Sequence, residues 1–96
     1  MKEAQAAVIE LSQRYALLDG EARPVVDELL SEWALSDDEN QRFKALALVS
    51  DHRIVSALPA LRELLVKLQD SPTPGAPYEQ AKIRRIMARL ENGAVA

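Results

Sequence analysis

The residues best suited to binding chemistry lie near the carboxyl end of the chain. Tyr78, Lys82, Arg85 and Arg89 are spaced at i, i+4, i+7 and i+11, and Arg84 flanks them. On a helix this spacing places all four residues of the basic stripe on one face. Such a face can bind the carboxylates of an acidic protein or the phosphates of a nucleic acid, or it can simply stay solvated. We take the basic stripe as the candidate partner-binding site.

Two other groups contain residue types found in enzymes and metal sites. The string Ser50-Asp51-His52 holds the residue types of a hydrolase triad. Neighbouring residues in a turn do not converge on one substrate atom, because a triad depends on its geometry. His52 is the only histidine and cysteine is absent, so no spaced set of metal ligands exists. We therefore expect no catalytic residue, no metal and no cofactor, and predict that the protein is not an enzyme.

The acidic run Asp37-Asp38-Glu39 offers carboxylates that could hold a metal or transfer protons. Ser36 precedes Glu39 by three residues, a spacing typical of the capping box at the start of a helix. Carboxylates at that position also stabilise the positive end of the helix dipole. We therefore predict a structural role for these acids.

Composition indicates one ordinary soluble domain over residues 1–96, with 48% apolar and 28% charged residues. The net charge is −3, but residues 19–39 sum to −7 and residues 40–96 to +4. We expect an acidic front and a mildly basic back. No run of about eighteen apolar residues is present, and the amino terminus lacks the pattern of a secretory signal. These absences favour a cytoplasmic protein with no membrane segment.

Apolar periodicity predicts five helices. The second helix begins near Pro24 and buries Trp33, and the third is apolar nearly all round, so it is expected to be the most enclosed and to form a hairpin with the fourth. Gly20 is expected to stop the first helix through a positive φ, and Asn92-Gly93 to stop the last. The other four helices are predicted over residues 2–18, 37–49, 54–68 and 78–90, with a loop over the proline-rich residues 70–77.

Two internal echoes indicate stacked helical units. Ala22–Leu30 returns 35 residues later as Ala57–Leu65, each opening on Ala-x-Pro, and Glu39–Leu46 returns more faintly as Glu79–Ile86. The stretch from Arg42 to Leu65 resembles one HEAT repeat, a helical hairpin whose second helix opens with Ala-x-Pro.

The resemblance implies an all-α, right-handed α-solenoid of five helices, about two and a half HEAT-like hairpins. Residues 37–69 match the repeat best. The remaining parts are a first hairpin or cap over residues 1–36, the proline-rich loop over residues 70–77 and a terminal helix over residues 78–91.

HEAT repeats bind proteins, and less often nucleic acids or a small ligand, and the resemblance implies no catalytic residue. We expect a non-catalytic protein-interaction or adaptor module that binds through the basic stripe or through the acidic surface around the second helix, with an acidic protein or a second copy of the chain as partner. The alternative is a small nucleic-acid-binding protein that uses the same basic stripe. A sequence pI near 5.1 disfavours that alternative.

Overall fold

The computed structural model describes residues 2–95, with side chains placed for residues 5–92. Over that range the chain forms five α-helices and one short 3-10 turn, with no strand, which confirms the predicted all-α fold. The elements are α1 (Lys2–Ala16), α2 (Ala22–Ala34), α3 (Glu39–Asp51), η1 (Val55–Ala57), α4 (Leu58–Gln69) and α5 (Ala76–Val95).

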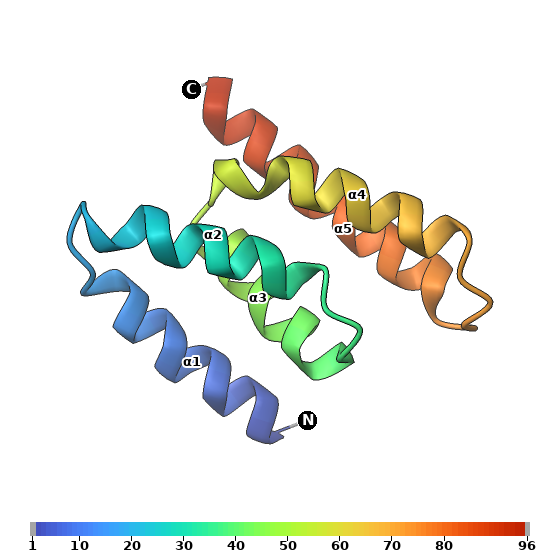
Figure 1. Ribbon diagram of the computed structural model, residues 1–96, viewed down its shortest axis with the longest axis horizontal. Helices are drawn as coiled ribbons and strands as arrows, with labels where there is room; N and C mark the ends of the chain where they lie inside the picture. The colour runs from blue at the N-terminus through green and yellow to red at the C-terminus, as the bar shows by residue number, and fades with distance from the viewer. Residues whose placement is uncertain (1, 96) are drawn as a thin grey trace.

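The helices are arranged in two layers. α2 packs along α3 and α4 packs along α5, with α2 and α4 in the front layer and α3 and α5 behind them (Figure 1). α1 packs mainly on α3. The expected hairpin of the third and fourth helices is not one of the close pairs, because α4 packs mainly on α5 and α2. The segment from His52 to Ala57 carries the chain from one layer to the other before α4 begins.

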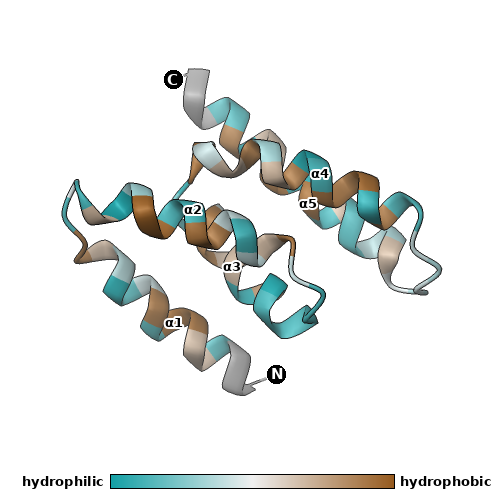
Figure 2. Cartoon of the chain, in the orientation of Figure 1, coloured by the Kyte–Doolittle hydropathy of each residue, from teal (hydrophilic) through white to brown (hydrophobic). Residues whose placement is uncertain are grey.

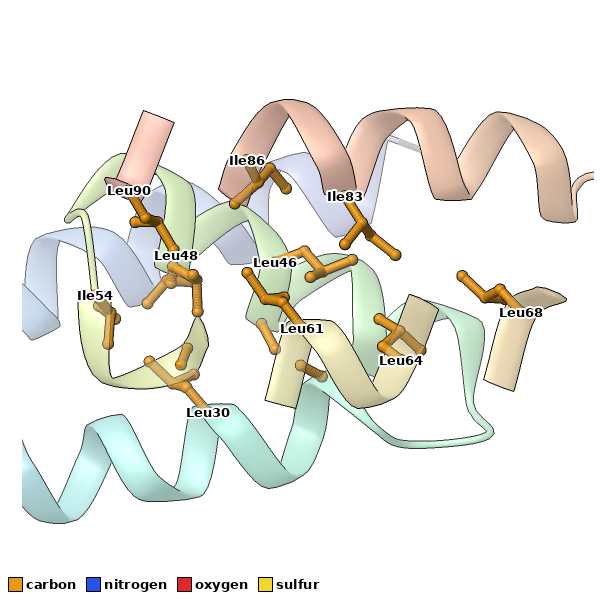
Figure 3. Packing of buried hydrophobic residues seen from close by; sticks show 14 of the residues in the cluster. Leu30, Leu46, Leu48, Ile54, Leu61, Leu64, Leu68, Ile83, Ile86 and Leu90 are labelled. Carbon is orange, nitrogen blue, oxygen red and sulfur yellow. The ribbon is translucent and has the colours of Figure 1, made fainter. Parts of the chain in front are cut away.

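One hydrophobic core joins the layers. Each helix carries both hydrophobic and hydrophilic residues (Figure 2), as helices that share a core must. Leu46 of α3, Leu61 of α4 and Ile83 of α5 are fully buried and point toward one another (Figure 3). α3 contacts α1, α2 and α5, as expected for the most enclosed helix. Trp33 packs against the edge of this core and is partly buried.

The start of α3 differs from the predicted capping box. The N-cap is Asp38, whose Oδ1 accepts hydrogen bonds from the amides of Asn40 at 2.9 Å and Gln41 at 3.4 Å. Ser36 Oγ instead accepts from the Asp38 amide at 3.0 Å and donates to Gln41 Oε1 at 2.7 Å. Asp38 is a good N-cap in its own right, so the helix begins two residues later than the capping box would place it. The predicted structural role of the acidic run holds for Asp38.

The end of α3 shows the one positive φ among the described residues, at Arg53 with φ 50°. The Ile54 amide donates to Val49 O at 3.0 Å and the Arg53 amide to Ser50 O at 3.4 Å. These two bonds form a Schellman motif, in which the residue after the C-cap adopts the left-handed conformation. Gly20 has no positive φ, and α1 ends before it at Ala16, so the expected glycine stop is wrong.

The last helix is longer at both ends than the sequence predicted. α5 begins at Ala76, so the loop ends at Gly75 and Pro77 lies in the first turn of the helix. Proline is tolerated there because the first amides of a helix have no carbonyl partner, and the burial of Ala76 favours the earlier start. Asn92-Gly93 does not stop α5, which continues to Val95. Residues 94 and 95 are therefore helical, and Ala96 lies outside the described residues.

Candidate protein-binding groove between α3 and α5

An open groove of about 820 Å³ runs between α3 and α5. Both helices contribute apolar side chains to its lining, and most of the polar side chains that line it are basic. The α3/α5 groove is lined by Leu46, Ala47, Ser50, Asp51, Arg53, Lys82, Arg85, Ile86, Ala88, Arg89 and Asn92. Four of these residues are cationic and one is acidic, so the lining has a net charge of +3.

Three residues of the basic stripe, Lys82, Arg85 and Arg89, line this groove. Arg53 adds a fourth cation from the end of α3, and sequence reasoning missed it. Its position depends on the left-handed turn that closes α3, which neither helical periodicity nor motif spacing reveals. The groove therefore combines charges from segments about 30 residues apart in the chain.

Tyr78 is separate from this groove. Its side chain is 75% exposed, and it lines a neighbouring hollow where the start of α5 meets α3 and α4. Lys82 and Arg85 line both hollows, but the hollow at Tyr78 also contains the acids Asp37, Glu39 and Glu79. Arg84 is exposed and lines neither hollow.

Lys82 has a contact that the sequence did not indicate. Its ammonium lies 4.8 Å from the centroid of the Phe43 ring, a cation–π arrangement between α5 and α3. The side chain is half-buried, in contrast to the exposed Arg85 and Arg89. Lys82 therefore joins the two helices as well as contributing charge to the groove.

A partly buried ion pair fixes α5 against α3. Arg42 Nε donates to Glu79 Oε1 at 2.8 Å and Arg42 Nη2 to Glu79 Oε2 at 3.2 Å. The two side chains are only 15% and 20% exposed. Arg42 also donates to the carbonyl oxygens of Ser36 at 2.9 Å and Asp37 at 3.3 Å. The hydrogen bond to Glu79 raises the pKa of Arg42, and the ion pair joins α3 to α5, the two helices whose residues line the groove.

His52 belongs to a different cluster, on the α1 side of the molecule. Its Nε2 lies 2.8 Å from Ser12 Oγ, and its ring packs 4.4 Å from that of Tyr15. The Tyr15 hydroxyl donates to Asp27 Oδ1 at 2.6 Å. Burial, together with this hydrogen bond, raises the pKa of Tyr15 to about 12. The cluster joins α1, α2 and the end of α3.

The string Ser50-Asp51-His52 is thus divided by the fold. Ser50 and Asp51 line the α3/α5 groove, whereas His52 contacts Ser12. The three side chains have no common target, as expected for neighbours in a turn. The Ser12–His52 bond could not be predicted, because the two residues lie 40 positions apart.

Within the part of the chain whose side chains are described, no three His, Asp or Glu side chains lie close enough to hold a metal ion. No helix in residues 2–95 is both long enough and apolar enough to cross a membrane. The chain matches no family model, and neither the curated proteins nor the solved structures give a match.

Proposed function

We propose that the protein is a non-catalytic interaction module that binds an acidic segment of a protein partner in the α3/α5 groove. The observation that carries this proposal is the convergence of Arg53, Lys82, Arg85 and Arg89 on one groove with a single acid. Apolar and small residues between the charges offer surface for a partner's apolar side chains.

The conformation of Arg53 also favours a binding role. A non-glycine residue in the left-handed region costs about 1 kcal/mol or more, and glycine is the usual residue at this position of a Schellman motif. An arginine there gives up stability and adds a charge to the groove. Residues held in such conformations cluster at functional sites.

The order of the helices supports a HEAT-like interpretation. Helices α2 and α4, which open with the two Ala-x-Pro segments, pack on each other in one layer. Helices α3 and α5, which carry the second echo, pack on each other in the other layer. Stacked HEAT hairpins give such layers and expose a continuous surface to partners, but the α3–α4 hairpin that the repeat requires is not one of the close pairs, so the support is confined to the layering. The resemblance rests on these features and on the quoted motifs.

Charge favours a protein partner over a nucleic acid. The chain carries a net charge of −3, and dedicated nucleic-acid binders are usually strongly basic. The exposed acids of α2 would repel a long phosphate backbone, whereas a short acidic segment of a protein can bind the groove alone.

The test uses paired charge reversals of equal size. Arg85→Glu with Arg89→Glu reverses the exposed groove charges, and Arg62→Glu with Arg84→Glu is the matched control outside the groove. Lys82 is left intact because it packs on Phe43. Proteins captured by the wild-type chain from its native host should be lost with the first variant and kept with the second, at unchanged helicity by circular dichroism.

Equal recovery with both variants would discard the groove as the binding surface. In parallel, the binding of random-sequence duplex DNA to the wild-type chain and to both variants is measured over a range of salt concentrations. Tight duplex binding that weakens steeply with salt and disappears in the Arg85→Glu, Arg89→Glu variant would instead support nucleic-acid binding, because phosphate contacts release counterions.

A further inference from the structure

The outward face of α2 is acidic with an apolar centre. Glu21, Val25, Glu28, Leu29 and Glu32 are all exposed, at i, i+4, i+7, i+8 and i+11. Val25 is 68% and Leu29 42% exposed, so this face carries two large apolar side chains between its acids. We call these five residues the acidic face of α2.

The acidic face of α2 complements the basic stripe in spacing and charge. The stripe on α5 also has positions i, i+4, i+7 and i+11, so each pattern extends about 16 Å along its helix. Two of the acids, Glu28 and Glu32, hold the same places in their pattern as Arg85 and Arg89 hold in theirs. The apolar Val25 and Leu29 suit the apolar and small residues that line the α3/α5 groove.

Both surfaces keep their charges available. Within the described residues, the ion pairs are Arg14–Glu10, Arg42–Glu79 and Lys67–Asp37. None of them uses an acid of the α2 face or an arginine of the α3/α5 groove. Charges on one face without partners nearby are free to pair with another molecule.

The two surfaces cannot meet within one molecule. α2 lies in the front layer and packs on α3, η1 and α4 (Figure 1), whereas the groove is lined by residues of α3 and α5 and by Arg53. Contact between unlike surfaces of two copies is heterologous, so it repeats head to tail until it closes into a ring or continues as a filament.

We propose that the occupant of the α3/α5 groove is α2 of a second copy of this chain, which makes the protein a head-to-tail self-associating module. This inference rests on the proposed function, because it names the partner of the same groove. The contact depends on exposed charges, so added salt should weaken it by screening them. The Debye length, over which charges still interact, falls from about 10 Å at 0.1 M to about 3 Å at 1 M.

The first experiment is sedimentation velocity of the full chain over a concentration series at about 50 mM and about 1 M salt. At low salt the average mass should rise with concentration above the monomer mass of 10.6 kDa. At high salt it should return to the monomer mass. A monomer at every concentration in low salt would overturn the proposal.

The second experiment is a charge swap. Glu28→Arg with Glu32→Arg makes the α2 face basic, and Arg85→Glu with Arg89→Glu makes the groove acidic. Each variant alone should remain monomeric, because its two surfaces then carry like charges. An equimolar mixture should associate, and so should one chain carrying all four changes, whose net charge equals that of the wild type. The Arg62→Glu, Arg84→Glu control should associate as the wild type does.

All six substituted residues are exposed, so the folds should persist, and circular dichroism checks this for each variant. Failure of the mixture and of the four-change chain to associate would overturn self-association. If the groove variant still loses partners from the native host, self-association fails while the proposed function stands. If it loses neither self-association nor partners, both proposals fail.

Discussion

At the scale of single residues, Arg53 links stability to the proposed binding in the groove. It adopts φ 50° at the end of α3 and lines the α3/α5 groove. Arg53→Gly should raise the free energy of unfolding by about 1 kcal/mol, because glycine takes this conformation without strain. The same change should weaken binding in the groove by removing a charge.

Chemical denaturation and a binding assay measure the two effects of Arg53→Gly. Arg53→Ala is the control, since it removes the charge and keeps the strain. It should weaken binding with no gain in stability. Equal stability of the two variants would show that the left-handed conformation carries no cost here.

The raised pKa of Tyr15 leads us to expect that the protein loses stability at alkaline pH. This pKa is raised to about 12 in the folded protein, against about 10 in an unfolded chain. A raised pKa means that the hydroxyl proton is held more tightly in the folded state. The resulting stability is fully present below pH 10 and is lost as the pH rises through 12.

Urea titrations between about pH 8 and pH 12 should therefore show a fall of about 2 kcal/mol in the free energy of unfolding. Tyr15→Phe has no hydroxyl proton, so its profile should lack this part of the fall. Identical slopes for the two proteins would contradict the titration of the buried Tyr15 hydroxyl as the source.

At the scale of elements, the Arg42–Glu79 pair holds α5 to α3. Removing either partner leaves a charge that is largely shielded from water, which costs more than the loss of an exposed pair. Arg42→Ala and Glu79→Ala should each lower the free energy of unfolding by about 1 to 3 kcal/mol. The double variant should lose less than the sum of the two, which is the coupling that a double-mutant cycle measures.

The chain offers its own control for this cycle. Arg14 and Glu10 form an ion pair at 2.8 Å on α1, with side chains 74% and 64% exposed. Exposed pairs of this kind contribute about 0.2 to 0.5 kcal/mol. If the coupling energy of Arg42–Glu79 is no larger than that of Arg14–Glu10, the pair does not hold α5 to α3.

Element boundaries followed local chemistry only in part. Two good capping residues stood close together, and Asp38 rather than Ser36 begins α3. Pro77 was expected in the loop, yet it lies in the first turn of α5, where Ala76 packs into the core. Local signals allowed either arrangement, and packing decided between them.

At the scale of the whole molecule, the unequal charge distribution becomes two separate surfaces. The acidic face lies on α2, and the basic groove lies between α3 and α5. Their separation favours intermolecular contacts, because a molecule cannot satisfy its own opposite charges across two layers. The same separation explains why a chain with a net charge of only −3 can carry a strongly basic groove.

The sequence by itself determined the all-α class and the five helices of the described residues. Helical periodicity is local, so it can be followed along the chain without knowledge of the fold. The spacing of Lys82, Arg85 and Arg89 was sufficient to place them on one face of α5 for the same reason.

Only the tertiary structure decided which helices pack together and which residues meet. It paired α4 with α5, turned Arg53 into the groove, joined Arg42 to Glu79 and separated His52 from Ser50. These contacts join positions far apart in the chain, and the spacing of residues carries no record of them. They are set by the burial of one shared core, which depends on all the helices at once.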